Sequence, residues 1–177
     1  MTGGTEYGKA LFMLTEERGT TDAVLPDVKA AEKIFSDNRD YVKLLDTPAL
    51  SKAEKLALCD GAFSSLDEDV RSLIKLLCER HSIHAFRDVA REFSKLYDES
   101  RGIEHVEAVT AVAMTDEQIA LMKEKLEKQT GKTIIIKNTV SPEILGGVKL
   151  RYSGKQLDGS VKTRLDKFEE SLKNTVI

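Results

Sequence analysis

The sequence contains no apolar run that approaches the roughly 20 residues needed to cross a bilayer, although 41% of its 177 residues are hydrophobic. We therefore expect any membrane association to go through partner proteins, with no direct membrane insertion. The opening residues lack the basic and apolar regions of a signal peptide, so we expect the chain to stay in the compartment where it is made. Only two cysteines are present, Cys59 and Cys78. Their spacing fits no metal site, and small buried apolar residues are the favoured interpretation.

A basic segment is also missing. The net charge is −3, with 15 Lys+Arg against 19 Asp+Glu in residues 1–103 and 12 against 11 in residues 104–177. Phosphate contacts need a clustered basic face, so this balance argues against a nucleic-acid partner. No Cys or Ser motif stands with a plausible base, so the sequence predicts no catalytic residue.

Helical periodicity dominates residues 1–103. Apolar residues recur at helical spacing from Thr5 to Arg18, and Gly19 supplies a stop. Asp22 can cap a second helix. Because proline is tolerated only in the first turns of a helix, Pro26 predicts that this helix begins late, near Leu25. A short third helix is expected around residues 41–45.

Two capping boxes open the next helices. Ser51-Lys52-Ala53-Glu54 begins a helix that ends near Gly61, and Ser65-Leu66-Asp67-Glu68 begins one that ends near Glu79. The second of these helices has more apolar surface than a core stripe needs. Val70, Ile74 and Leu77 suffice for the core, so Leu73 and Leu76 are expected to face outward. A further helix from Ser82 to about Glu99 completes a bundle of about six helices.

After Gly102 the apolar period changes from helical to nearer two, and a second domain is expected to begin. The pattern predicts a strand from His105 to Met114, a helix capped by Thr115 and ended by Gly131, and a strand from Thr133 to Val140. A strand from Val148 to Tyr152 and a final helix follow. The expected fold class is α+β: an N-terminal bundle of about six α-helices (residues 1–103) followed by a small C-terminal α+β domain of order βαββα (residues 104–177).

Two patterns resemble chemical sites. Gln129 to Thr133 contains the end of a phosphate-binding loop, but the required earlier glycine is missing, so Gly131 is interpreted as a helix C-cap. Cys78, His81 and His84 step by three, as zinc ligands can, but structural zinc sites take four ligands and catalytic ones three. No fourth Cys or His lies nearby, and we expect no metal and no cofactor.

The stretch from Ile144 to Leu172 is the most informative part of the sequence. Gly146 and Gly147 permit an unusual backbone entry into the strand, with close chain packing favoured over anion binding. Ser153-Gly154-Lys155 is expected to turn, and Asp158 or Ser160 to cap the final helix. That helix carries an apolar stripe whose larger part is expected in the core and whose outer edge could receive a partner helix: Val161, Leu165, Phe168 and Leu172.

The segment GGVKLRYSGKQLDGSVKTRL resembles the C-terminal signature of the delta subunit of bacterial F-type ATP synthases, the counterpart of the mitochondrial oligomycin sensitivity-conferring protein. Tyr7-Gly8-Lys9-Ala10-Leu11-Phe12 is similar to the opening helix of that family, with Gly8 where the family usually has alanine. The length also fits, so the resemblance spans the chain.

The resemblance implies a non-catalytic stator subunit on the cytoplasmic face of the cell membrane, peripheral through its complex. It would link the catalytic head to the peripheral stalk during proton-driven ATP synthesis. In this family the N-terminal bundle holds the N-terminal helix of an alpha subunit between its first and fifth helices, and the C-terminal domain meets the b-type stalk subunits. The residues expected to contact the alpha-subunit helix are Tyr7, Ala10, Leu11, Leu14, Leu73 and Leu76.

Two alternatives from other classes remain at this point. A helical RNA-binding or transcription-adaptor protein would need a basic groove, which the acidic N-terminal half does not favour. A small nucleotide-dependent enzyme would need saturable, magnesium-dependent nucleotide binding.

Overall fold

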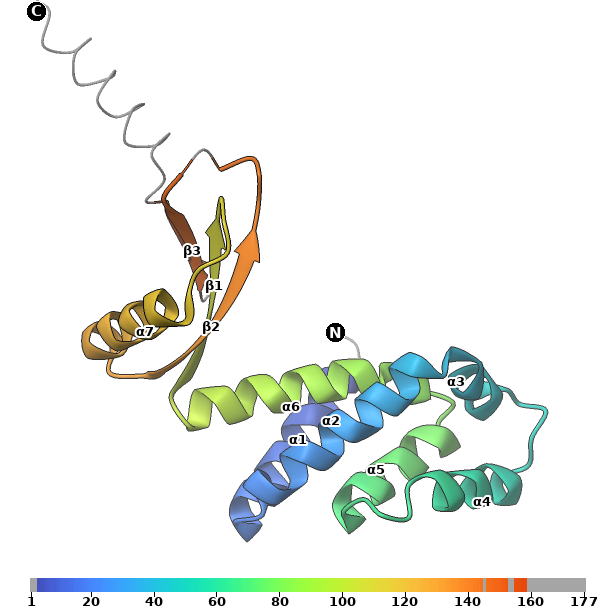
Figure 1. The fold of residues 1–177 in the computed structure, drawn as a ribbon. Coiled ribbons are helices and arrows are strands. Elements are labelled where there is room, and N and C mark those ends of the chain that lie inside the picture. Colours follow the sequence, from blue (N-terminus) through green and yellow to red (C-terminus); the bar gives the residue numbers. More distant parts are fainter. Residues whose placement is uncertain (1–2, 145, 153–154, 159–177) are drawn as a thin grey trace, which may run out of the picture. The chain divides into compact units, whose positions relative to one another are not determined.

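The computed structural model describes residues 3–144, 146–152 and 155–158. The chain divides into two compact units, Met1–Asp98 and Glu99–Ile177. The described part of the first unit consists of helices joined by short connections. The second unit contains a four-stranded sheet, with a helix between the first two strands in chain order (Figure 1). The predicted α+β class is confirmed.

The N-terminal bundle has the predicted number of α-helices, six, with a short 3₁₀ helix before the last. In chain order they are α1 (Gly3–Arg18), α2 (Thr21–Asp37), α3 (Arg39–Asp46), α4 (Lys52–Ala62), α5 (Glu68–Glu79), η1 (Ile83–Ala85) and α6 (Phe86–Ser100). Gly19 ends α1 with a positive φ of 67°, a conformation that glycine adopts without strain.

Aromatic side chains fill the centre of this bundle. The ring of Phe35 on α2 lies 5.1 Å from that of Phe63 and 5.2 Å from that of Phe86, centroid to centroid. A second aromatic pair, Phe12 and Phe93, joins α1 to α6 at 5.9 Å with an edge-on geometry. Burying one such side chain contributes about 1.5–3 kcal/mol, so these contacts hold together helices that are distant in sequence.

One of the two predicted capping boxes is confirmed, since Ser51 and Glu54 cap α4 reciprocally. The predicted cap at Thr115 is also confirmed, and Thr115 forms a capping box with Gln118 at the start of α7 (Asp116–Thr130). The box predicted at Ser65 is wrong. Asp67 caps α5 instead, because its side chain accepts the N–H of Asp69 at 2.8 Å and its own N–H donates to Asp27 on α2.

The late start predicted for the second helix is also wrong. α2 begins at Thr21, and Pro26 lies inside it. Val24 and Val28 are one turn apart on either side of the proline, and both are fully buried. Continuing the helix through Pro26 loses one backbone hydrogen bond but keeps both valines in the core, and this burial outweighs the loss.

The C-terminal sheet has the strand order β2-β1-β3-β4. β1 (Ile103–Thr110) runs parallel to β2 (Thr133–Val140), and α7 connects them. A parallel pair needs such a crossover because its strands cannot be joined by a tight hairpin. β3 (Val148–Tyr152) lies antiparallel to β1 and to β4 (Lys155–Asp158).

The last strand corrects the predicted βαββα order, which contained three strands. β4 is the next strand after β3, and its last residue, Asp158, pairs with Lys149. Their side chains form an ion pair at 3.1 Å between Nζ and Oδ2. Asp158 as a cap of the final helix stays a prediction, because that helix lies outside the described residues. The predicted turn residues Ser153 and Gly154 lie outside the described residues, as does the predicted final helix with Ser160, Val161, Leu165, Phe168 and Leu172.

Candidate partner-binding surface

Helices α1 and α5 are neighbours in the bundle and run antiparallel. At one end, Nη1 of Arg18 on α1 lies 2.8 Å from both carboxylate oxygens of Asp69, in the first turn of α5. At the other end, Tyr7 on α1 and Arg80, just after α5, line the same hollow. The predicted partner residues therefore lie on two adjacent helices, between these two points.

The exposed members of the predicted set are Ala10, Leu14 and Leu76. Leu14 is 36% exposed and Leu76 is 37% exposed, both high for leucine side chains in a bundle. Tyr7 is half-buried. Along the antiparallel pair, Leu14 and Leu76 lie at heights that differ by about one helical turn or less.

Leu73 is buried, with an exposed fraction of 9%, so the expectation that it faces outward is wrong. Leu73 is three residues after Val70 and four before Leu77, which places it on the same helical stripe as these two core residues. Leu11 is also buried, at 5%. Both leucines belong to the core of the bundle, and their assignment as partner contacts stays a prediction.

The close approach of α1 to α6 fixes the position of α1. A Cβ atom added to Gly4 would lie 2.8 Å from the carbonyl oxygen of Ala85, and one added to Gly8 would lie 2.8 Å from that of Val89. Both glycines are buried. Gly8 therefore acts in helix packing, on a different face of α1 from the exposed Ala10.

The hollow at the N-terminal end of α1 has a volume of about 530 Å³. Gly3, Gly4 and Tyr7 form one wall, and Arg80 and Asp88 contribute charges of opposite sign.

The three residues considered as zinc ligands have separate partners. Sγ of Cys78 lies 3.4 Å from Sγ of Cys59, Nδ1 of His81 lies 3.0 Å from Nζ of the buried Lys55, and Nδ1 of His84 lies 2.7 Å from Oδ2 of Asp46. No group of three or more His, Cys, Asp or Glu able to hold a metal occurs in the described part of the chain.

The two thiols form a buried pair between α4 and α5. Their hydrogen bond lowers the pKa of Cys59, whose sulfur it stabilises in the thiolate form, and raises the pKa of Cys78. Both side chains are at least 98% buried, at exposed fractions of 2% and 1%, which agrees with the interpretation as small core residues. Nearby, burial raises the pKa of Tyr41 to about 12, and its hydroxyl donates to the carbonyl of Leu58 at 3.0 Å.

Gly131 adopts the left-handed conformation at the end of α7, with φ 68°, and its N–H donates to the carbonyl of Glu127. The interpretation of the Gln129 to Thr133 stretch as a helix end followed by a strand is confirmed. Gly147 enters β3 with φ 84°, as expected for a glycine that redirects the chain into a strand.

Sequence reasoning missed an apolar groove in the C-terminal unit. It has a volume of about 610 Å³ between α7 and the sheet, with Leu121, Met122 and Leu126 on one side and Val148 and Leu150 on the other. Leu121 is 58% exposed, and α7 has no buried residue. The sequence contained only a weak signal for this groove, because the spacing of the apolar residues of α7 is also typical of a helix that packs against a core.

Together these features describe a two-unit binding protein with exposed apolar surface on each unit. The model of the family "ATP synthase delta (OSCP) subunit" matches residues 4–172. Relatives named "ATP synthase subunit delta" from Geobacillus sp. (strain WCH70) and Clostridioides difficile (strain 630) are 32% and 31% identical. These alignments cover 94% and 96% of this chain, and 94% and 95% of the relatives.

Among solved structures, a chain of the Toxoplasma gondii mitochondrial ATP synthase hexamer superposes with a TM-score of 0.71 at 21% identity. The match covers 97% of this chain and 98% of that one, and it shows a shared fold.

This chain belongs to the ATP synthase delta (OSCP) subunit family. It is thus a structural stator subunit, a peripheral component of the complex that is not itself catalytic, and its roles in ion transport and in the peripheral stalk follow from the family. The resemblance drawn from the two sequence motifs is confirmed. Within the described part of the chain, no helix is both long and apolar enough to cross a membrane.

Proposed function

We propose that this subunit joins the catalytic head of the ATP synthase to the peripheral stalk on the cytoplasmic face of the cell membrane, during proton-driven ATP synthesis. The N-terminal bundle holds the N-terminal helix of an alpha subunit against α1 and α5. The C-terminal unit binds the b-type stalk subunits. The link keeps the head from turning with the rotor.

The observation that carries the head contact is the pair of exposed leucines on neighbouring helices. Leu14 and Leu76 are exposed on helices whose Leu11 and Leu73 are buried in the core, and the small side chain of the exposed Ala10 leaves room for close approach. A link under torque needs slow dissociation, which a helix seated on apolar side chains provides better than exposed charge pairs. The Arg18–Asp69 ion pair supports this by tying the two helices together at one end.

The stalk contact is supported by the groove between α7 and the sheet. Its apolar lining, with Leu121 exposed, matches the apolar face of an amphipathic helix. Exposed apolar surface of this kind in a small unit marks an interaction site. The two proposed sites are on different units, so the two attachments are separable.

A shortened chain that ends at Ile103 tests this separation. Circular dichroism checks whether the shortened chain stays folded and helical, as we expect. We expect it to bind a synthetic peptide of the alpha-subunit N-terminus as tightly as the full chain does, and not to co-purify with b-type subunits. Loss of peptide binding by a folded residue 1–103 fragment would contradict the assignment of the head site to the bundle. Retained b-subunit binding would contradict the assignment of the stalk site to the C-terminal unit.

A further inference from the structure

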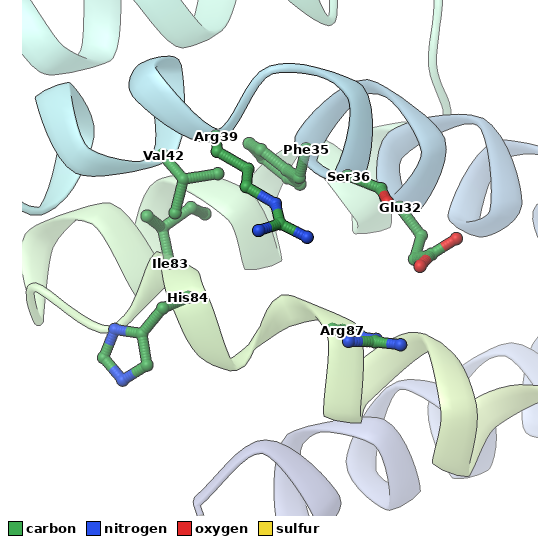
Figure 2. Close-up of a pocket in the computed structure, with 8 residues that line it drawn as sticks. All are labelled: Glu32, Phe35, Ser36, Arg39, Val42, Ile83, His84 and Arg87. Atoms are coloured by element: carbon green, nitrogen blue, oxygen red, sulfur yellow. The ribbon is translucent and has the colours of Figure 1, made fainter.

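A second hollow in the N-terminal bundle lies where α2, α3 and η1 meet the start of α6. It has a volume of about 360 Å³. Its floor is apolar, made by Phe35 (7% exposed), Val42 and Ile83 (1% exposed). Figure 2 shows the Arg39 guanidinium reaching over this floor toward α6, where Arg87 lies.

The charge of this hollow differs from that of the unit around it. Arg39 and Arg87 are both exposed, and neither has a hydrogen bond or an ion pair with any described residue. Glu32 is the one carboxylate in its lining, and His84 at the edge is already paired with Asp46. The hollow is therefore positive, although residues 1–103 carry an excess of acidic side chains.

The positive surface continues along the same two helices. A smaller hollow of about 290 Å³ shares Glu32 and Arg87 with the first and adds Lys29 and Arg91. Arg91 pairs with Asp88 at 3.4 Å, whereas Lys29 forms no ion pair with any described residue. The result is a furrow between α2 and α6 in which cations outnumber anions.

We propose that this furrow, defined by Arg39, Arg87 and the Phe35, Val42 and Ile83 floor, binds an acidic peptide segment of a partner protein. An apolar side chain of that segment covers the floor, and flanking Asp or Glu carboxylates pair with the two guanidinium groups. Guanidinium forks match carboxylate geometry, and apolar contact beside the ion pairs reduces their screening by water. This contact is additional to the alpha-subunit helix and the b-type subunits.

The lining favours a peptide over a nucleic acid. Proteins that bind single-stranded nucleic acids present exposed aromatic rings on which bases stack. Phe35, the aromatic residue of this hollow, is only 7% exposed and its ring packs on Phe63 and Phe86. The side chains of α6 that face α1, near Val89, lie on another face of that helix from Arg87, so the furrow and the α1–α5 surface can be occupied together. Two separated contacts would resist pivoting of the bundle under torque.

A photo-crosslinking experiment in membranes that contain the assembled synthase tests the proposal. The benzophenone amino acid p-benzoylphenylalanine replaces Ser36, which lines the hollow, in the full chain. Mass spectrometry then identifies the attached segment. We expect one partner segment with an apolar residue flanked by carboxylates. The Arg39→Gln/Arg87→Gln double variant should reduce the yield of the crosslinked adduct at least about tenfold, because each substitution removes a charge-assisted hydrogen bond to the partner segment.

A matched control removes the same charge elsewhere. Lys33 on α2 and Lys137 on β2 are exposed and do not line this hollow. The Lys33→Gln/Lys137→Gln variant should leave the yield unchanged. The proposal is overturned by a crosslinked nucleic acid, by a segment without acidic residues, by equal yields in the two double variants, or by no adduct in an assembled complex. Thermal unfolding of both double variants checks that the bundle is intact.

Discussion

Gly8 on α1 lies against the backbone of Val89 on α6, so closely that a Cβ atom on Gly8 would be 2.8 Å from the Val89 carbonyl oxygen. The same Cβ would be 2.9 Å from Cβ of Glu92. Glycine is therefore required at this spacing of the two helices. α1 and α6 pack more closely here than an alanine at position 8 would allow.

We predict that Gly8→Ala destabilises the bundle by about 1–3 kcal/mol, because the added methyl group meets backbone atoms that cannot rotate away. Urea denaturation measures the change. Gly61→Ala is the matched control, since Gly61 is an exposed residue of α4 and a Cβ there would meet no atom within 4 Å. It should raise stability by about 0.5–1 kcal/mol. Equal effects of the two changes would refute the packing role of Gly8.

The α4 capping box predicts an acid-sensitive step. The carboxylate of Glu54 accepts the hydroxyl proton of Ser51 at 2.7 Å and its N–H at 2.9 Å, which holds the pKa of Glu54 below its ordinary value of 4.5. A depressed folded-state pKa gives stability that is fully present above the unfolded pKa and is lost as the pH falls through the folded pKa.

Thermal unfolding between pH 7 and pH 2.5 measures this contribution. We expect the difference in Tm between the native chain and Glu54→Gln to be largest near pH 7, and to shrink below pH 4.5 as the native carboxylate takes up a proton. Exposed Glu6 on α1 serves as the control position. A Glu54→Gln difference that stays constant across this range would count against the capping interaction as the cause.

Local sequence signals predicted most elements of this fold. Thr133 to Val140 and Val148 to Tyr152 were predicted with their observed bounds, because β-branched residues between turn signals have few alternative structures. Local sequence signals gave the wrong helix start where a residue distant in sequence determines it. Asp27 binds the N–H of Asp67 and moves the start of α5, and core burial on both sides of Pro26 keeps α2 helical.

The candidate site was less predictable than the fold. Helical spacing correctly placed Val70, Ile74 and Leu77 in the core. The same spacing puts Leu73 on their stripe, and the prediction failed because spacing does not tell how wide a stripe the neighbouring helices cover. The Arg18–Asp69 contact joins residues 51 positions apart. Arg39 and Arg87 line the same hollow because α3 packs on η1, just before α6. They are far apart in the sequence, so no local pattern links them.

We predict that the purified, chelator-free protein contains no stoichiometric transition metal at Cys78, His81 and His84. The structure gives a physical reason: His84 and Cys78 are held by Asp46 and Cys59, and the buried Lys55 ammonium lies beside His81. A cation close to a site repels a metal ion. Elemental analysis by mass spectrometry settles the question, and one zinc per chain that Cys78→Ser removes would overturn it.

Head binding at the α1–α5 surface is the central claim, and two charge insertions are designed to disrupt it. Leu76→Asp and Ala10→Asp change exposed side chains, so each should alter the free energy of unfolding by less than about 1 kcal/mol. Leu73→Asp is unsuitable, since Leu73 is buried and the bundle would lose stability. Leu58→Asp on α4, at a residue 38% exposed, is the matched control.

Isothermal titration calorimetry of the full chain with a synthetic peptide of the alpha-subunit N-terminus is the most direct measurement. Loss of one well-packed anchor costs about 2 kcal/mol or more, which is roughly thirtyfold in affinity. We predict that Leu76→Asp and Ala10→Asp each weaken peptide binding at least about thirtyfold, whereas Leu58→Asp binds as the native chain does. Native affinity in both folded variants, Leu76→Asp and Ala10→Asp, would contradict head binding at α1 and α5.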